Sequence, residues 1–177
     1  GGAALTNTNS GTTRGIVSTG AITIANAGAI DNQSGYIGAN GGLNITGSAS
    51  IDNRQGALLG LGTSSVHTTG LLNNQGGSIK SNSSLAIGAG TLDNSGANSV
   101  VFANGDLTVT AGHIDNSNTK NGAFTTGLLA AGNLSVTAAT VNNANGAIVS
   151  LGDTSVKATT SLNNTGGQIA GNTVTID

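Results

Sequence analysis

Residues 30–47 read IDNQSGYIGANGGLNITG, and the pattern of this stretch recurs along the whole chain. An aliphatic residue is followed by Asp or Asn and then by Asn, and a second aliphatic residue stands seven positions after the first. A turn rich in Gly and Asn then leads to a pair of apolar residues spaced by two. Spacing by two is the period of a β-strand, so the stretch predicts short strands separated by corners.

Eight copies of this unit follow one another along the chain. Their first aliphatic residues are Leu5, Ile30, Ile51, Leu72, Leu92, Ile114, Val141 and Leu162. The intervals between these residues are 25, 21, 21, 20, 22, 27 and 21 residues. The second aliphatic residues are Ile16, Ile37, Leu58, Ile79, Val100 or Val101, Leu128 or Leu129, Ile148 and Ile169.

The apolar positions recur in the same order and direction in every unit. Successive units must therefore stack as parallel coils, three short strands to a coil. Parallel crossovers are strongly biased toward the right-handed form. We predict an all-β fold, a right-handed parallel β-helix (solenoid) of about eight coils of ~21 residues, in which residues 1–177 form a single β-helical segment.

One column of Asn accompanies the repeat. Its members are Asn7, Asn32, Asn53, Asn74, Asn94, Asn116, Asn143 and Asn164. Identical amides stacked at strand spacing can hydrogen-bond along the column, and Asn tolerates the backbone of a tight corner. We expect a structural Asn ladder at a bend, with the preceding residue, such as Asp31 or Asp52, pointing outward because stacked like charges are costly to bury.

Composition favours a packed core and argues against several partners. Hydrophobic residues make up 36% of the chain and charged residues 7%, which does not fit disorder driven by charge. Five scattered Lys and Arg form no basic stripe, and three aromatic residues give little surface for stacking on bases, so we expect no nucleic acid. The chain contains no run of ~20 apolar residues, so we expect no membrane insertion. We expect a monomeric rod.

The sequence offers no constellation for catalysis and no motif for a metal or cofactor. There is no Glu and no Cys, and His67 and His113 lie about two units apart, which suits solvated corner residues better than a shared metal site. Pairs such as Asp31 with Asp52 could attract a cation, but a surface carboxylate column is the simpler interpretation. Asp106 and Asp153 occupy turns, where Asp commonly bonds its own backbone.

Two insertions lengthen the first and sixth units at the same place, within Thr8–Gly15 and Ser117–Gly127. Loops that grow from one corner of a solenoid lie on one face, which is often a binding face. The second insertion holds a cation and an aromatic residue, so Lys120, Asn121 and Phe124 are the candidate binding residues. Ordinary loop variation is the alternative.

The recurrent φ-[D/N]-N-x-x-G-x-φ pattern, seen as IDNQSGYI, LNNQGGSI and LNNTGGQI, resembles the repeats of filamentous haemagglutinins and of contact-dependent growth inhibition exoproteins. The resemblance covers the whole chain. It implies an internal piece of a large Gram-negative exoprotein that is exported through an outer-membrane two-partner secretion transporter and is secreted or displayed at the cell surface. The family's secretion domain carries Asn-Pro motifs, and this chain has no Pro, so transporter recognition lies outside it.

Three functions fit this resemblance to different degrees. The first is a non-enzymatic structural stalk that projects an adhesive or receptor-binding region, or a toxin cargo, away from the cell. The second is a direct adhesin module that binds a host or target-cell receptor or glycan through the inserted loops. The third, a polysaccharide-cleaving enzyme, needs clustered acids and bases, and the sparse charges argue against it. We expect no enzyme activity and no cofactor.

Overall fold

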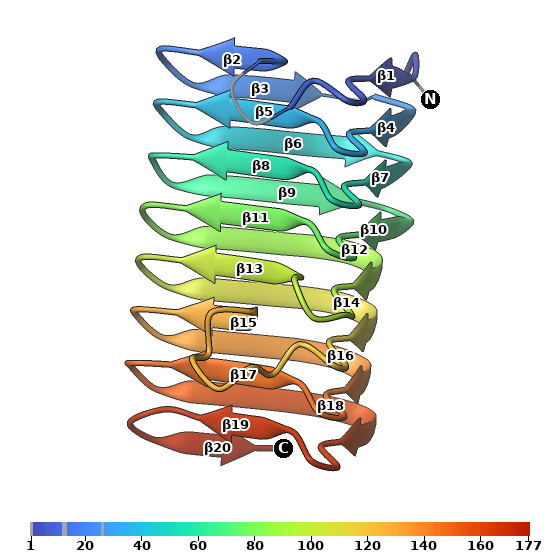
Figure 1. Ribbon diagram of the computed structural model, residues 1–177. Helices are drawn as coiled ribbons and strands as arrows, with labels where there is room; N and C mark the ends of the chain where they lie inside the picture. The colour runs from blue at the N-terminus through green and yellow to red at the C-terminus, as the bar shows by residue number, and fades with distance from the viewer. Residues whose placement is uncertain (1, 12–13, 26) are drawn as a thin grey trace.

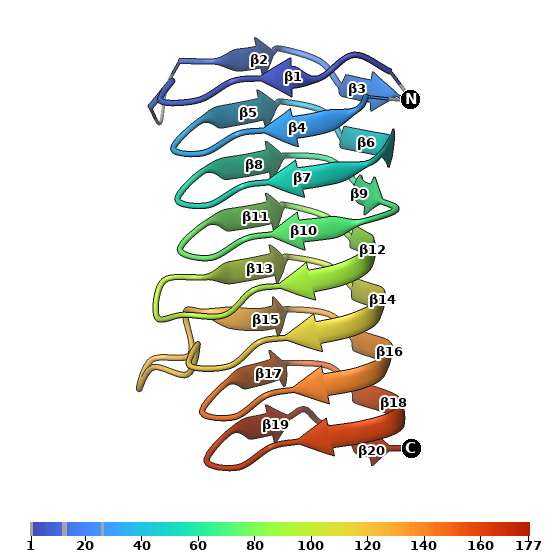
Figure 2. The same cartoon turned by 90° about the vertical axis from the view of Figure 1, so that its right-hand side faces the viewer.

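The computed structural model describes residues 2–11, 14–25 and 27–177, and all regular elements in these ranges are β-strands. They form two parallel sheets that wrap around one interior (Figure 1). From the N-terminus the chain winds right-handedly down a rod, coil below coil (Figures 1 and 2). Strand pairing brings Ile30 beside Ile51 and Ile51 beside Leu72. The predicted parallel β-solenoid of about eight turns is confirmed.

The twelve-stranded sheet, sheet A, supplies two sides of each coil. Its strands are β1 (Leu5–Thr6), β3 (Ile22–Ala25), β4 (Ala29–Asp31), β6 (Leu43–Ser48), β7 (Ser50–Asp52), β9 (Ser64–Thr68), β10 (Leu71–Asn73), β12 (Leu85–Asp93), β14 (Leu107–Asp115), β16 (Leu134–Asn142), β18 (Thr154–Asn163) and β20 (Val174–Ile176).

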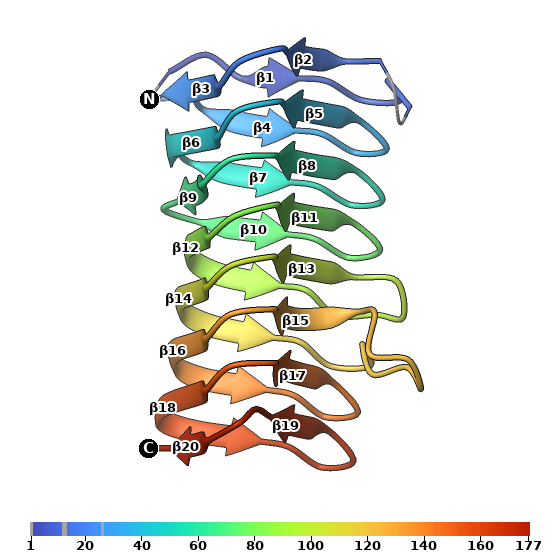
Figure 3. The same ribbon diagram turned by 90° about the vertical axis from the view of Figure 1, so that its left-hand side faces the viewer.

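The eight-stranded sheet, sheet B, supplies the third side. Its strands are β2 (Ile16–Ser18), β5 (Tyr36–Ala39), β8 (Ala57–Gly60), β11 (Ser78–Ser81), β13 (Val100–Ala103), β15 (Gly127–Ala130), β17 (Ala147–Ser150) and β19 (Gln168–Ala170). The corners that lead into sheet B are aligned down one edge of the rod, and the longer loop before β15 projects from that edge (Figure 3).

The expected three short strands per coil are present in the N-terminal coils only. From β12 onward, two of the strands join into one of nine or ten residues that bends without a break. Small residues lie at these bends, such as Ala111 and Gly112. In the earlier coils Ser48 and Thr68 lie buried at the bend, and Thr68 Oγ1 donates to Ser48 O at 3.0 Å. This side-chain bond adds to the backbone bond that Thr69 N donates to Ser48 O at 3.0 Å.

Aliphatic columns fill the interior. In sheet B the inward column is Ile16, Ile37, Leu58, Ile79, Val101, Leu128, Ile148 and Ile169. Six of these eight side chains are at most 1% exposed, and each fully buried aliphatic contributes about 1.5 to 3 kcal/mol. The sequence left open whether Val100 or Val101, and whether Leu128 or Leu129, faces inward. The register assigns Val101 and Leu128 to the interior because they align with Ile79.

The corner into sheet B explains the Asn-x-x-Gly part of the repeat. The third residue has a left-handed backbone, as at Gln55 with a φ of 56° and Asn145 with a φ of 52°. The fourth must be Gly for a different reason. A Cβ on Gly77 would lie 2.2 Å from Asn53 O, the backbone of the coil above. The corner thus packs too closely for any side chain at this position.

Candidate functional site

The Asn column lies at this corner and forms a continuous chain of amide hydrogen bonds. Each Nδ2 donates to Oδ1 of the next Asn toward the C-terminus. The seven donor–acceptor distances, from Asn7 to Asn164, lie between 2.7 and 2.8 Å. The six members from Asn32 to Asn143 are fully buried. Asn74 Nδ2 also lies 3.1 Å from Val100 O and 3.2 Å from Gly77 O, so the amide fastens the corner to two coils.

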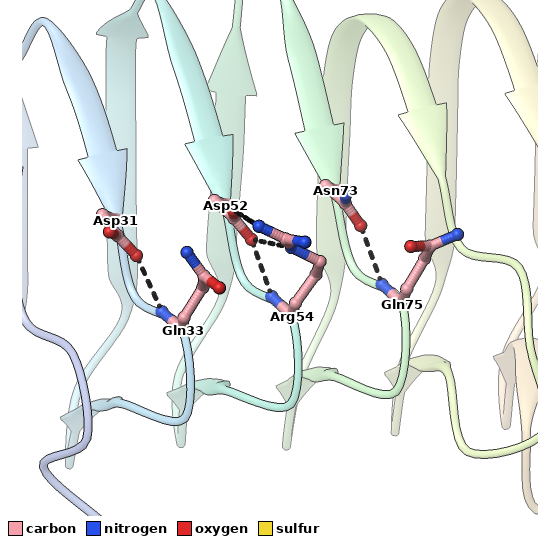
Figure 4. A network of polar contacts seen from close by, with 6 residues as sticks. All are labelled: Asp31, Gln33, Asp52, Arg54, Asn73 and Gln75. Carbon is pink, nitrogen blue, oxygen red and sulfur yellow. Dashed lines mark hydrogen bonds and ion pairs between the residues drawn. The ribbon is translucent and has the colours of Figure 1, made fainter.

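In the seven coils from Asp31 to Asn163, the residue before the ladder Asn lies on the outside of the corner and caps the backbone two residues later. Asp31 Oδ1 accepts from Gln33 N at 3.1 Å, and Asn73 Oδ1 accepts from Gln75 N at the same distance (Figure 4). Asp and Asn serve this purpose equally because both present an acceptor oxygen. The carboxylates of this column therefore serve to stabilise the backbone of the corner.

One charged pair lies on this column. Arg54 Nη2 lies 2.7 Å from Asp52 Oδ2 (Figure 4). Burial raises the pKa of Asp52, but the hydrogen bonds and charge of Arg54 outweigh it and hold this pKa below its ordinary value. The hydrogen bond to Asp52 raises the pKa of Arg54. Both side chains are solvent-accessible, so the pair contributes little to stability.

Asp106 and Asp153 do not bond their own turns, and the sequence-based expectation for them is wrong. Asp106 Oδ1 accepts from Asn133 N at 2.8 Å, and Asp153 Oδ1 accepts from Thr173 N at 3.0 Å, each in the coil below. Parallel stacking places the next backbone N–H closer than that of the residue's own turn. The hydrogen bonds from Asn172 and Thr173 lower the pKa of Asp153.

The two histidines lie apart on the outside of sheet A. The His67 ring lies over Gly88, where a Cβ would come within 2.2 Å of Nδ1. His113 Nδ1 lies 2.7 Å from Thr140 Oγ1. Within residues 2–11, 14–25 and 27–177 there is no group of three or more His, Cys, Asp or Glu suited to a metal ion. The same ranges contain no helix long and apolar enough to cross a membrane.

The insertion of the sixth coil folds back onto the rod. Lys120 Nζ donates to Gly166 O, two coils away in the chain. Asn121 is turned inward on its own loop, because its Nδ2 donates to Thr125 Oγ1 at 2.8 Å and its Oδ1 accepts from Thr125 N at 3.1 Å. The structure therefore places Lys120 and Asn121 in contacts that hold the loop. Lys120 is exposed but bonded to the rod, whereas Phe124 is half-buried and lines two open hollows.

Hydroxyl groups adapt both insertions to the regular corner. In an ordinary coil the first N–H of a sheet B strand donates to a Gly carbonyl of the coil above, as Ala57 N does to Gly35 O at 2.8 Å. In the lengthened coils a side chain substitutes: Tyr36 N donates to Ser10 Oγ at 2.9 Å and Ala147 N to Thr119 Oγ1 at 3.1 Å. Part of the first insertion, residues 12–13, lies outside the described residues.

Phe124 borders two open hollows on the outer face of sheet B. The first, of about 250 Å³, lies between Lys80, Phe102 and Phe124, with Thr125 at its rim. The second, of about 410 Å³, continues past Leu129 to Leu151. A third hollow of about 270 Å³ lies near the N-terminal end of the same face, lined by Val17, Tyr36, Leu59 and Leu61 among others.

The repeat pattern did not predict this face. Its central outward column, here called the outer strip, runs through Val17, Gly38, Leu59, Lys80, Phe102, Leu129, Val149 and Ala170. Six of these eight residues carry an apolar side chain. The signal was present as adjacent apolar residues, such as Leu58–Leu59 and Ile148–Val149, because neighbours in a strand face opposite sides of a sheet.

Comparison with known families agrees with the repeat and the fold. A profile of the haemagglutinin repeat matches residues 1–100, 88–126 and 129–177, which together span nearly the whole chain. Comparison with curated proteins and with solved structures gave no match. The matches confirm the resemblance that the Asn-containing repeat suggested, and the chain belongs to the haemagglutinin repeat family.

Proposed function

We propose that this chain is a rigid, non-enzymatic stalk segment of a filamentous exoprotein that is secreted or displayed at the bacterial cell surface. A two-partner secretion transporter in the outer membrane exports it through a region outside these residues. The stalk carries an adhesive or receptor-binding region, or a toxin cargo, away from the cell. The family membership supports the exoprotein context, and the solenoid supports the stalk.

The observation that carries this proposal is that the repeated polar residues are used to join coils. The ladder amides bond one another, and the column before them caps the corner backbone. Every buried side-chain N or O atom of the described residues has a hydrogen-bond partner. A solenoid built in this way gains stability with each coil added, because each coil contacts only its neighbours. Eight coils at ~4.8 Å spacing give a rod about 35 to 40 Å long.

Electron microscopy of the full-length secreted protein tests the stalk. We expect a continuous thin rod that runs through the haemagglutinin repeats, with a length of ~4.8 Å per coil and a distinct mass at one end. Globular particles joined by flexible linkers would overturn the proposal. A matched preparation with residues 52–72 duplicated should lengthen the rod by one coil without changing its width.

A second candidate function is direct adhesion through the insertion face, and the exposed surface around Phe124 favours it. Phe124 lies on sheet B with hollows on either side, which is where a receptor or glycan would find apolar contact. Aromatic side chains are enriched at binding surfaces because they bring large contact area at low entropic cost.

Replacing the insertion separates the two functions. Residues 117–126 are exchanged for Arg-Gln-Gly, the turn that follows Asn53 in a regular coil. The new Gly carbonyl can accept from Ala147 N in place of Thr119 Oγ1, so the coil should keep its stacking and its thermal midpoint. Binding to target cells and to a glycan array is then compared with that of the original chain. Unchanged binding supports the stalk alone, and lost binding assigns adhesion to the loop.

A further inference from the structure

The two sheets differ in the chemistry of their outer faces. The corresponding outward column of sheet A is Thr23, Asn44, Ser65, Ala86, Thr108, Ser135, Ser155 and Thr175. Seven of these eight residues are polar, whereas the outer strip of sheet B has one charged residue, Lys80, and no other polar side chain. The central outward column is thus polar in sheet A and largely apolar in sheet B.

Parts of the outer strip are accessible to a partner: Val17 is exposed, Leu59, Phe102, Val149 and Ala170 are half-buried, and Leu129 is only 8% exposed. Val17 is 59% exposed, and Leu61 and Leu151 beside the strip are 41% and 79% exposed. The Tyr36 ring lies over Gly38 and fills the gap that the missing side chain leaves, since a Cβ there would come within 2.5 Å of the ring. These apolar residues recur from coil to coil rather than standing singly, and a contiguous apolar surface is characteristic of an interaction site.

We propose that the outer strip joins two copies of this chain side by side, sheet B against sheet B. The strip is linear and repeats once per coil, so a partner that matches it along its length must be linear with the same repeat. A second rod of this chain meets that condition. A single charge in the strip also allows like faces to meet with little repulsion.

The size of the face agrees with a weak, specific pair. Eight strands at ~4.8 Å spacing, with about four residues of ~3.3 Å rise in each, give a face of about 500 Å² per copy. A pair would bury about 1,000 Å² in total, which is near the lower bound for specific interfaces. Each further coil with the same outward residues would add to this area.

The surface relief assigns an antiparallel arrangement. The insertion loop forms a ridge over β13, β15 and β17, where Phe124 lies between Phe102 and Leu129. A hollow lies over β2, β5 and β8. A two-fold axis between β11 and β13 places the ridge of each copy against the hollow of the other, which makes the contact self-complementary.

Parallel pairing has two disadvantages that the antiparallel arrangement avoids. It sets Lys80 against Lys80 and the ridge against the ridge. In the antiparallel pair the Lys80 ammonium faces Phe102 of the second copy, and a cation near an aromatic face is attracted to it. The charge and the relief of the strip therefore favour the same arrangement.

Sedimentation equilibrium of residues 1–177 over a concentration series up to ~1 mM tests the pairing, because interfaces of this size bind weakly. We expect the mass to rise toward twice that of the monomer. Val17→Lys with Val149→Lys should weaken association at least about tenfold by placing unpaired charges in the contact. Thr23→Lys with Ser155→Lys makes the same charge change on sheet A of the same coils and should leave association unchanged. A monomer at all concentrations, or equal effects of both variants, would overturn the proposal.

Cross-linking tests the orientation, and the chain has no native Cys to interfere. Val17→Cys and Ala170→Cys, which the two-fold axis places opposite each other, are treated, alone and mixed, with a bis-maleimide that spans the ~10 Å between packed sheets. Antiparallel pairing predicts cross-links in the mixture only. Cross-links in each variant alone would indicate parallel rods and contradict the proposal. If the chain is strictly monomeric and the lysine substitutions in the outer strip abolish its binding to cells or glycans, the strip binds a different partner and the proposal is contradicted.

Discussion

Each residue of the corner sequence Asp/Asn-Asn-x-x-Gly meets a separate physical demand. The first caps the backbone two residues later, and the second joins the ladder. The fourth adopts a left-handed backbone, as Gly76 does with a φ of 65°, and the fifth admits the coil above. These demands are independent, so substitutions at neighbouring positions should differ sharply in cost.

Asn74→Leu should destabilise the rod far more than Asp52→Asn. Leucine removes the ladder acceptor of Asn53 Nδ2 and leaves the buried Asn94 Oδ1 without its donor, and a buried unpaired group costs about 1 to 3 kcal/mol. Asn at position 52 keeps the capping oxygen, as Asn73 demonstrates, and loses only a solvent-exposed ion pair that contributes little to stability. Urea denaturation measures both free energies of unfolding, and comparable losses would contradict the assigned roles.

Two adjacent glycines provide a matched test of space against backbone angle. Gly77→Ala places a Cβ 2.2 Å from Asn53 O, so the coil must shift, and we expect a loss of roughly 1 to 3 kcal/mol from overpacking. Gly76→Asn keeps a left-handed residue that Asn145 already supplies in another coil, and the nearest atom to the new Cβ is Gln55 Cγ at 3.5 Å. Its thermal midpoint should change little. A larger loss of stability in Gly76→Asn than in Gly77→Ala would contradict the roles assigned to the two positions.

At the scale of the element, the sequence predicted which residues enter the core but not what the strands present outward. The recurrence of the unit identified Ile37, Leu58 and Ile79 as its second aliphatic position, and stacking follows directly from identical positions. Adjacent apolar residues such as Val100 and Val101 satisfy either face, so the register was needed to assign them. The contacts of Lys120 could not be predicted because an insertion has no repeat to fix its backbone.

The turn at Asp153 should make stability depend on pH at the acid end. Its pKa is lowered in the folded state, so the unfolded chain binds the proton more tightly. The stabilisation is therefore present above the unfolded pKa of ~3.9 and is lost as pH falls through the lower folded value. Asp153→Asn removes this dependence. The gap in thermal midpoint between the two proteins should close from pH 6 to pH 2, and a constant gap would exclude the carboxylate as its source.

At the scale of the whole molecule, the rod behaves as a stack whose members contact only their neighbours. The sequence predicted this architecture well, because the order of apolar positions within each unit excludes a meander. It could not predict where strands would fuse, as in β12 and β14, since that depends on how small residues such as Ala111 and Gly112 bend the sheet. The outer strip emerged only once all coils were aligned.

Removing one whole coil should preserve the fold. Ile51 pairs with Leu72, so deletion of residues 52–72 joins equivalent positions and leaves every remaining contact in register. We expect a cooperative transition with an urea m-value lowered by roughly one part in eight, in proportion to the surface buried. Deletion of residues 52–61 breaks the register and should abolish cooperative unfolding. Similar transitions from both deletions would contradict the additive stack.

The stacking geometry also fixes how the rod would respond to a mechanical load. A pull along its axis acts on one coil boundary at a time, so coils should peel off in succession rather than fail together. Each released coil replaces ~4.8 Å of rod with ~21 residues of extended chain, about 70 Å. A short rod of this kind can extend to many times its own length under tension, and each unfolding step dissipates part of the work done by the load. It can therefore act as an extensible tether that limits the force on whatever is bound at its far end.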